Sequence, residues 1–218
     1  MLPPSFLNGL ELFQLNLLVL AVYATIVAFV FYKMWEDVSD FVSIEFDRAA
    51  LTQQLASKHL QEVLDLQFQL ADRYKPDQVS VLKLTTLNHS KTAPLYINWE
   101  RSTLTNLQGE SQRLIRVVPG GINLAQRQVS GVVAPARKLE ETLTAEEALQ
   151  QDATGRLVPG GALFSGAEIN QAIAKQKPFT LRLVVELPGT ATKPGPEYAL
   201  LCHFYLKRTP LKRALYWD

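Results

Sequence analysis

The histidines and the single cysteine are the side chains best suited to catalysis or metal binding, and they are scattered along the chain. His59, His89 and His203 stand far apart, and no His-x-x-x-His or Cys-x-x-Cys spacing occurs. A dedicated zinc site usually shows such a spacing, because it needs several ligands close together. Cys202 and His203 are adjacent, but neighbouring residues of a strand point to opposite faces. The sequence therefore predicts neither a metal centre nor a bound cofactor.

Other combinations resemble catalytic motifs only superficially. Ser80-x-x-Lys83 matches a Ser/Lys nucleophile pattern, yet side chains three apart on a strand face opposite ways. The glutamate pairs 140–141 and 146–147 lie in a polar stretch, which is typical of a solvated face. The sequence contains no Gly-x-Ser-x-Gly, no phosphate-binding loop and no Gly-x-Gly-x-x-Gly. These observations predict a protein that is not an enzyme.

One tryptophan and three arginines have the chemistry of a binding surface. Trp99 stands next to the charged pair Glu100-Arg101, and Arg113 and Arg116 follow in the next strand-like run. Tryptophan and arginine are enriched among the residues that dominate protein interfaces. We therefore choose Trp99, Arg101, Arg113 and Arg116 as candidate interaction residues. The alternative for Trp99 is a core aromatic at a strand end.

The C-terminal segment carries a directional charge. Residues 188–218 hold five basic residues against two acidic ones. Basic pairs that end in aromatic residues can rest on an anionic membrane surface. The predicted surface contacts are Lys207, Arg208, Lys212, Arg213 and Trp217. The alternative is a solubilising tail that protects a sheet edge with charge and proline.

An apolar stretch near the N-terminus is the element that most constrains where the candidate interaction and membrane-surface residues lie relative to a membrane. Residues 12–32 contain no charge and are bracketed by Glu11 and Lys33. At about 1.5 Å per residue they reach roughly 30 Å, the thickness of a hydrocarbon core. No basic segment precedes them and no small-residue cleavage site follows, so we expect an uncleaved single-pass anchor rather than a signal peptide. This anchor is the predicted contact with membrane lipid.

The charges around the stretch predict its orientation. Lys33 and Arg48 follow it, whereas residues 1–11 contain neither lysine nor arginine. Lysine and arginine near a span favour the cytoplasmic side. We therefore expect the large C-terminal part on the cytoplasmic side.

Residues 33–75 form a predicted acidic neck, with eight acidic residues against five basic ones. From residue 48 to residue 75, apolar residues recur at three- and four-residue steps, and Pro76 follows, so an amphipathic helix is predicted there. Two roles stay open for this helix. It packs on the next domain or prolongs the anchor as a stalk, or it pairs with a second copy as a short coiled coil and makes a homodimer.

Beyond residue 76 the pattern becomes that of short strands separated by turn residues. The predicted strands are 79–87, 95–99, 111–118, 128–133, 179–187 and 198–207, with a further short strand at 139–143. Two capping-box sequences, 144–147 and 165–168, predict short helices at 145–151 and 166–175. The predicted class is mainly β with α: a flank (1–11), a transmembrane helix (12–32), a helical stalk within 33–75, and an antiparallel β-sandwich or barrel-like domain (76–218).

A Val-Pro-Gly-Gly sequence occurs twice, at 118–121 and 158–161, each time preceded by an arginine at the same offset. The flanking residues do not continue the match. Pro-Gly is good turn chemistry in its own right, so we interpret the recurrence as two turns rather than a duplicated unit.

Several short motifs between about residue 60 and residue 150 form a recognisable set. They are Gln69–Tyr74, Trp99-x-x-Ser102-x-Leu104, Gly109-x-Ser111-x-Arg113-x-Ile115-Arg116, Val132–Pro135 and Leu143–Glu146. In these motifs the chain resembles uncharacterised cyanobacterial single-span membrane proteins. The resemblance implies a cyanobacterial plasma or thylakoid membrane, and it implies no activity and no catalytic residues.

The composition excludes several classes of protein. With 218 residues, a net charge of +1, 47% hydrophobic residues and one cysteine, the chain is not a disordered tail, a disulfide scaffold or a polytopic membrane protein. The near-zero net charge exerts no pull on nucleic acid. We predict a membrane-anchored, non-enzymatic accessory or scaffold protein whose β-domain binds another protein. The alternatives are a module that binds a lipid or pigment in a barrel mouth, and an enzyme whose site is assembled from distant residues.

Overall fold

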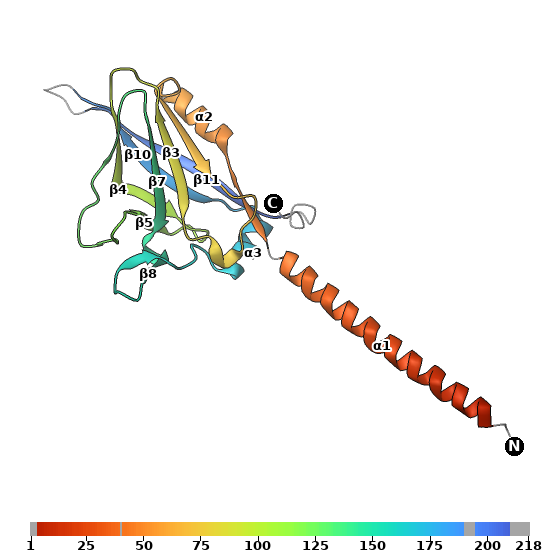
Figure 1. Cartoon of the computed structure of the whole chain (residues 1–218). Coiled ribbons are helices and arrows are strands. Elements are labelled where there is room, and N and C mark those ends of the chain that lie inside the picture. The colour runs from red at the N-terminus through yellow and green to blue at the C-terminus, as the bar shows by residue number, and fades with distance from the viewer. Residues whose placement is uncertain (1–3, 40, 190–194, 210–218) are drawn as a thin grey trace. The chain divides into compact units, whose positions relative to one another are not determined.

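The computed structural model describes residues 4–39, 41–189 and 195–209, and within the N-terminal helix it describes the side chains of residues 16–33. The chain forms two compact units. One contains the helix α1 (Pro4–Ser39), and the other is a β-rich domain that runs from Phe41 to Thr209 (Figure 1).

The helix α1 contains the predicted apolar stretch. Its segment Asn16–Lys33 has a mean hydropathy of 1.8, none of it is buried, and it is long and apolar enough to cross a membrane. Its large apolar side chains other than Val27 are 52–65% exposed. Within this segment the Thr25 hydroxyl is bonded internally, since its Oγ1 donates to the Ala21 carbonyl oxygen at 2.8 Å. That bond satisfies the hydroxyl without water, as a lipid environment requires.

The β-domain is built on an antiparallel sheet that curls into a nearly closed barrel (Figure 1). The order along the sheet is β1-β11-β10-β4-β5-β7-β3-β2, and β6 pairs with β4. The two ends of this path meet through paired backbone bonds between Val42 on β1 and Tyr74, which follows β2: N to O distances are 2.9 and 2.7 Å. The strands are β1 (Val42–Phe46), β2 (Leu64–Gln69), β3 (Leu82–Asn88), β4 (Leu95–Thr105), β5 (Ser111–Arg116), β6 (Gly131–Val133), β7 (Lys138–Ala145), β10 (Phe179–Glu186) and β11 (Glu197–Arg208).

Smaller elements complete the domain. The strands β8 (Leu149–Gln151) and β9 (Leu157–Pro159) form a separate hairpin. The helices are α2 (Arg48–Ser57) and α3 (Gly166–Lys175), with the 3₁₀ turns η1 (Pro76–Gln78) and η2 (Glu146–Ala148).

Five phenylalanines run through the interior of the barrel in contact with one another. Phe204 is central, with ring centroids 4.8 Å from Phe68, 4.8 Å from Phe179 and 5.2 Å from Phe46. Phe164 extends the cluster from Phe179. Since Phe46 lies on β1 and Phe68 on β2, their contact at 4.8 Å ties together the two ends of the sheet. Aromatic pairs of this kind stabilise by about 0.5–1.5 kcal/mol beyond their buried area.

The helix α2 seals a seam that strand pairing leaves open. β1 pairs only with Phe204–Arg208, so the earlier half of β11 has an unpaired edge on that side. The Gln54 side chain takes the place of a strand there: its Nε2 donates to the Leu201 carbonyl oxygen at 2.7 Å, and its Oε1 accepts from the Leu201 amide at 2.9 Å. At the first residue of the helix, Arg48 contacts both carboxylate oxygens of Asp65 on β2 at 3.2 Å. The helix thereby bridges β11 and β2.

The predicted helix over 48–75 is wrong beyond Ser57. The chain turns at His59, which has a positive φ of 56°, and then forms β2. Leu66 and Phe68 fall off the helical stripe, but they alternate with polar residues, and they face the core from the strand. A period of two therefore overrides the weaker helical spacing.

This correction removes the basis for the predicted coiled coil. The apolar residues of α2, Leu51 and Leu55, are buried in the domain's own core and are not available to a second copy. The predicted neck also disappears as a separate region, because β1 lies within it and residues 41–75 belong to the β-domain. The domain therefore begins near Phe41 rather than at residue 76.

The remaining elements follow the prediction closely. Each predicted strand corresponds to one of β3, β4, β5, β6, β7, β10 and β11, whereas β1, β2, β8 and β9 were not predicted. The helix at 166–175 is confirmed, and its capping box is complete: Ser165 Oγ accepts from the Glu168 amide, and Glu168 Oε2 accepts from the Ser165 amide. The helix at 145–151 is wrong. Thr144 ends up in β7, where its hydroxyl donates to the Ser80 carbonyl oxygen, and only a 3₁₀ turn follows.

The two Val-Pro-Gly-Gly sequences adopt different conformations. Gly120 and Gly121 both have left-handed φ angles, 97° and 102°, which glycine adopts without strain. Gly160 and Gly161 instead follow β9, and their amides both donate to the Ala148 carbonyl oxygen. The recurrence is therefore not a structural repeat, in agreement with the turn interpretation.

The edge-sealing role of Gln54 leads to a stability prediction. Gln54→Ala removes both bonds to the Leu201 backbone, and we expect a loss of about 1–3 kcal/mol in the free energy of unfolding. Hydrogen exchange at the Leu201 amide should accelerate at the same time. The measurement is chemical denaturation and hydrogen exchange of the detergent-solubilised full chain. Gln53→Ala, at the exposed neighbouring position, is the matched control and should leave both quantities unchanged.

Candidate functional site

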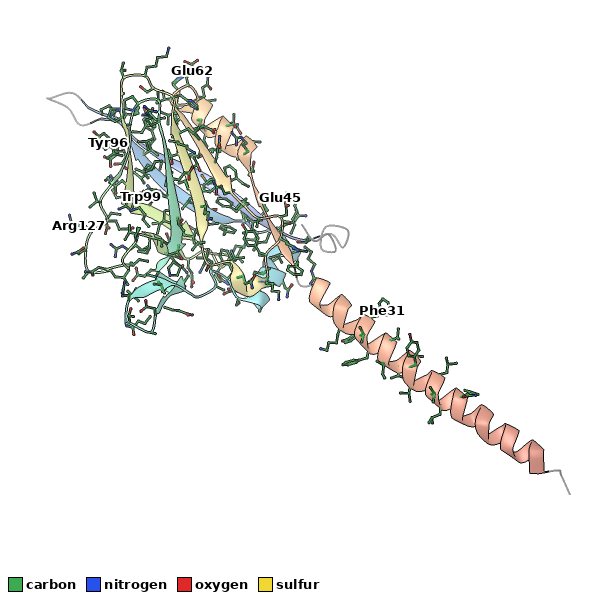
Figure 2. The ribbon with its side chains drawn as sticks, viewed as in Figure 1. Phe31, Glu45, Glu62, Tyr96, Trp99 and Arg127 are labelled. Carbon is green, nitrogen blue, oxygen red and sulfur yellow. The ribbon has the colours of Figure 1, made fainter. Side chains whose placement is uncertain are left out.

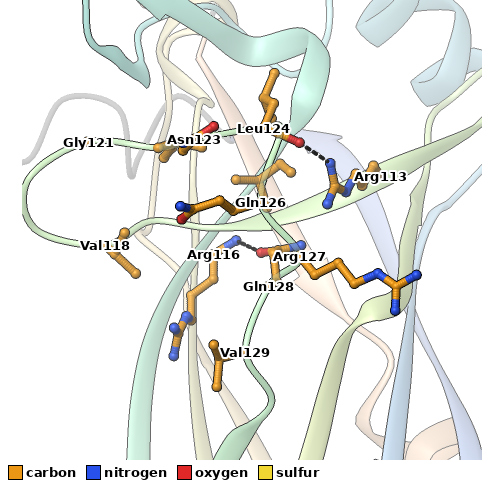
Figure 3. A pocket seen from close by; sticks show the side chains of 12 residues that line it. Arg113, Arg116, Val118, Gly121, Asn123, Leu124, Gln126, Arg127, Gln128 and Val129 are labelled. Atoms are coloured by element: carbon orange, nitrogen blue, oxygen red, sulfur yellow. Dashed lines mark hydrogen bonds between the residues drawn. The ribbon is translucent and has the colours of Figure 1, made fainter.

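A surface hollow of about 200 Å³ lies beside the segment that joins β5 to β6 (Figure 3). Its lining combines two kinds of side chain: polar ones from Arg113, Arg116, Asn123, Gln126, Arg127 and Gln128, and aliphatic ones from Ile115, Val118, Ile122, Leu124 and Val129. We call it the arginine hollow. It brings together Arg113 and Arg116, two of the candidate interaction residues, with Arg127, which was not among them.

A change of strand partner explains why Arg113 and Arg116 border one hollow. β5 pairs with β4 through Ser111–Arg113 and with β7 through Leu114–Arg116. At the switch, Leu114 and Ile115 are both buried, so the usual alternation of faces is interrupted. Two residues three positions apart, which a regular strand would place on opposite faces, therefore reach the same region.

A wide bulge in β4 supplies the acidic partner of Arg113. Val184 stands opposite Asn98 and Arg182 opposite Thr103, so the residues between them on β4 face Leu183 alone. Glu100 lies in this bulge, and both of its carboxylate oxygens accept from Arg113 Nη2, at 3.0 and 2.9 Å. The pKa of Glu100 is lowered from its ordinary value, first by the Arg113 bond and then by the bond from the Gln128 amide.

Gln128 anchors the loop to the exposed edge of β5. Its Nε2 donates to the Leu114 carbonyl oxygen at 2.7 Å, and its Oε1 accepts from the Arg116 amide at 2.8 Å. Its own amide donates to Glu100 at 3.1 Å. The same side-chain chemistry that seals β11 through Gln54 thus holds the floor of the hollow in place.

The three arginines differ in how many hydrogen bonds and ion pairs they make within the domain. Arg113 also donates to the Leu124 carbonyl oxygen at 3.1 Å, and Arg116 donates to Glu141 at 3.2 Å. The side chains of Arg113 and Arg116 are 25% and 24% exposed. Arg127 is exposed, and within the described residues its side chain makes no hydrogen bond or ion pair. Two glutamates therefore face three arginines, and Arg127, whose charge acts on Glu100 without a direct contact, is the one that is not bonded to a glutamate.

The other candidate interaction residues lie elsewhere. Trp99 is fully buried in the core, as its alternative role required, and its side chain is not on the surface. Its Nε1 has no hydrogen-bond partner among the described residues, and it lies so close to Gly131 that a Cβ atom there would be 2.9 Å away. Arg101 lies outside the arginine hollow, where it pairs with Glu197 across the sheet. Figure 2 shows Trp99 within the domain and Arg127 at its periphery.

The predicted membrane-surface residues are only partly described. Lys207 pairs with Glu45 on the neighbouring strand β1, and Arg208 donates to Asn170 on α3 at 3.2 Å. Both side chains are already engaged within the domain. Lys212, Arg213 and Trp217 lie outside the described residues.

The titratable groups of the described residues do not converge on a catalytic or metal site. No group of three or more His, Cys, Asp or Glu side chains able to hold a metal is found among them. His203 shares a hydrogen bond with Thr180 at 3.0 Å, while Cys202 beside it is buried, and burial raises the pKa of its thiol to about 12. A thiol with such a pKa is unreactive at neutral pH. Each member of the pair Glu140-Glu141 is engaged by a basic residue, Lys138 or Arg116.

Sequence reasoning missed Arg127 and Gln128. The only available signal was a polar run, Gln126–Gln128, after a Pro-Gly-Gly turn, and nothing in it distinguishes a loop anchor from ordinary surface residues. No protein-family model, curated protein or solved structure matches this chain.

The packing of Trp99 leads to a prediction at Gly131. A Cβ atom at this position would lie 2.9 Å from Trp99 Nε1 and 3.2 Å from Leu139 Cδ2. Gly131→Ala should therefore lower the free energy of unfolding by about 1–3 kcal/mol through overpacking. Thermal unfolding followed by tryptophan fluorescence measures this. Gly166→Ala adds the same methyl group into open space and should be neutral; equal effects of the two changes would contradict the explanation.

The ion pair of Glu100 leads to a pH prediction. Because the pKa of Glu100 is lowered in the folded protein, its bonds stabilise the loop above the ordinary carboxyl pKa of 4.5, and this contribution is lost as the pH falls below that value. Exchange of the Gln128 amide hydrogen, corrected for its intrinsic pH dependence, should show reduced protection below pH 4.5. In Glu100→Gln, protection should be lower at neutral pH, and its pH dependence should be weaker than in the parent protein.

Proposed function

We propose that this protein is a membrane-anchored, non-enzymatic scaffold whose β-domain binds another protein at the membrane surface. The observation that carries the proposal is the contrast between its two units. Most of the described large apolar side chains of α1 are exposed by half or more, whereas the β-domain buries its own apolar residues in a continuous core. An exposed apolar helix of this length is stable in lipid and would be a liability in water.

The short connection between the units supports a role at the membrane surface. Only Asp40 and Phe41 separate the end of α1 from the start of β1. Two residues extend over at most about 7 Å, so a membrane-spanning α1 would tether the domain closely. The cyanobacterial membrane, and the choice between plasma and thylakoid membrane, remain predictions of the sequence resemblance.

The packing of the barrel favours a scaffold over the alternative of a lipid or pigment carrier. Large side chains occupy the interior, including Trp99, Phe179 and Phe204, all fully buried. The arginine hollow lies on the surface, and three arginines and three amide side chains line it together with five aliphatic ones. A wall of mixed polarity suits a protein segment that carries charged and aliphatic side chains better than a lipid tail alone.

Membrane integration is tested by carbonate extraction of membranes from expressing cells. The full chain should remain in the membrane pellet. Two charges in the middle of α1, Val22→Arg with Ile26→Arg, should release it, since each arginine there raises the insertion free energy by about 2.5–3.5 kcal/mol. Gln53→Arg with Gln61→Arg places the same charges on exposed positions of the domain and should have no effect. Extraction of the unmodified chain by carbonate would overturn the proposal.

The side of the membrane is tested by cysteine labelling. The native Cys202 is buried and its pKa is raised to about 12, so it gives little background with maleimides. A cysteine introduced at the exposed position 138, Lys138→Cys, should react with an impermeant maleimide only after cell lysis if the domain is cytoplasmic. Labelling in intact cells would place the domain on the other side.

A pull-down from solubilised membranes that recovers no stoichiometric partner would contradict the scaffold role.

A further inference from the structure

We propose that the arginine hollow receives an extended acidic segment of a partner protein, with Arg127 as the principal contact for its carboxylates. This inference rests on the proposed scaffold function and specifies the chemistry of its partner. The occupant follows from charge. Of the three arginines at the hollow, Arg113 and Arg116 are bonded to glutamates of the domain, and the exposed Arg127 is the one without such a partner in the described part of the chain.

The hollow is built before any partner arrives. Glu100 orients Arg113 through both oxygens, and Glu141 orients Arg116, while Gln128 ties the loop that carries Arg127 to the β5 backbone. Prearranged side chains lose less entropy on binding. Arginine presents five N–H donors in a fork that matches a carboxylate, and only some donors of Arg113 and Arg116 are used within the domain. Each can therefore add a bond to a bound carboxylate.

The placement of the arginines fits a chain rather than a single small anion. In Figure 3 the guanidinium groups of Arg116 and Arg127 point in different directions. Two carboxylates on one chain can each bind one of them. An extended segment repeats its side-chain direction every second residue, at roughly 6.6 Å, so successive acidic residues can address both arginines.

An apolar contact is present beside these charges. Val129 lines the hollow and is 74% exposed, which is unusual for a valine in a domain with such a continuous core. The residues that alternate with the acidic ones in an extended segment would face the opposite way, except at a bend or at the segment's end. A valine or leucine of the partner at such a position can cover Val129. The expected partner segment is therefore acidic, with an aliphatic residue at a bend or at its end.

The test uses the full chain in a zwitterionic detergent and a fluorescent ten-residue peptide of alternating glutamate and valine. Binding is measured by fluorescence anisotropy, with a glutamine–valine peptide as the uncharged comparison. We expect the acidic peptide to bind, its affinity to fall with added salt, and the uncharged peptide to bind at least roughly tenfold more weakly. Arg127→Glu should weaken binding of the acidic peptide by roughly tenfold or more.

The matched control is Arg137→Glu, which makes the same change of charge at an exposed position that does not line the hollow. It should retain the parent affinity within about twofold, as expected for a change that alters only the long-range charge. Unfolding temperatures of both variants establish that neither has lost its fold. If Arg137→Glu weakens binding as much as Arg127→Glu, or if Arg127→Glu has no effect, the hollow is not the site and the inference fails.

Mixed micelles of the same detergent with phosphatidylserine provide the remaining arm. If the lipid displaces the acidic peptide from the parent protein but not from Arg127→Glu, and the peptide itself binds more weakly than the lipid, the hollow recognises anionic lipid. In that case the acidic-segment inference is overturned. Binding to the peptide is measured in detergent and does not depend on membrane side or integration. Its failure would therefore leave the anchored scaffold standing, whereas failure of carbonate resistance would remove the scaffold without affecting the peptide result.

Discussion

Every strand edge of a sheet carries backbone N–H and C=O groups that must be bonded, and the β-domain depends on how this requirement is met where strand pairing stops. β1 covers only part of β11, and β4 covers only part of β5. In both places a glutamine side chain takes over, because its amide has one acceptor and two donors in the arrangement of a peptide group. Gln54 bonds both backbone groups of Leu201, and Gln128 bonds the groups of Leu114 and Arg116.

The two glutamines that replace strand pairing have different consequences for the structure. At β11 the glutamine comes from a helix whose Leu51 and Leu55 join the core, so the seam becomes part of the barrel wall. At β5 the glutamine comes from a loop that does not pair with β5 as a strand, and space remains beside it. The arginine hollow is that space. At this incomplete part of the sheet, an arginine not bonded to a glutamate, an exposed valine and a concave wall therefore occur together.

The bulge in β4 contributes to the same arrangement. A regular strand would pair Glu100 within the sheet, whereas the bulge lets it accept from Arg113 and from the Gln128 amide. Ser102 restores the lost backbone bonds, since its hydroxyl accepts from the Val184 amide and donates to the Asn98 carbonyl oxygen. Bulges are common next to binding sites because they redirect side chains at little cost in pairing. Here the redirected residue orients an arginine.

The sequence alone determined the apolar helix, most strands after residue 78 and the helix at 166–175, because each of these depends on local signals: uninterrupted hydropathy, β-branched runs between turns and a complete capping box. The prediction was wrong over 48–75, where helical spacing in residues 48–64 hid the two-residue period of Leu64, Leu66 and Phe68. That period becomes decisive only because the barrel needs a further strand to close. Trp99 illustrates the same limit, since its residue type suits both a core and an interface, and only packing decides. Arg113 and Arg116 were chosen by residue type, but their convergence with Arg127 requires a change of strand partner and a loop anchored by Gln128. Those are long-range contacts, which no local pattern encodes, and so the site itself was decided by the tertiary structure.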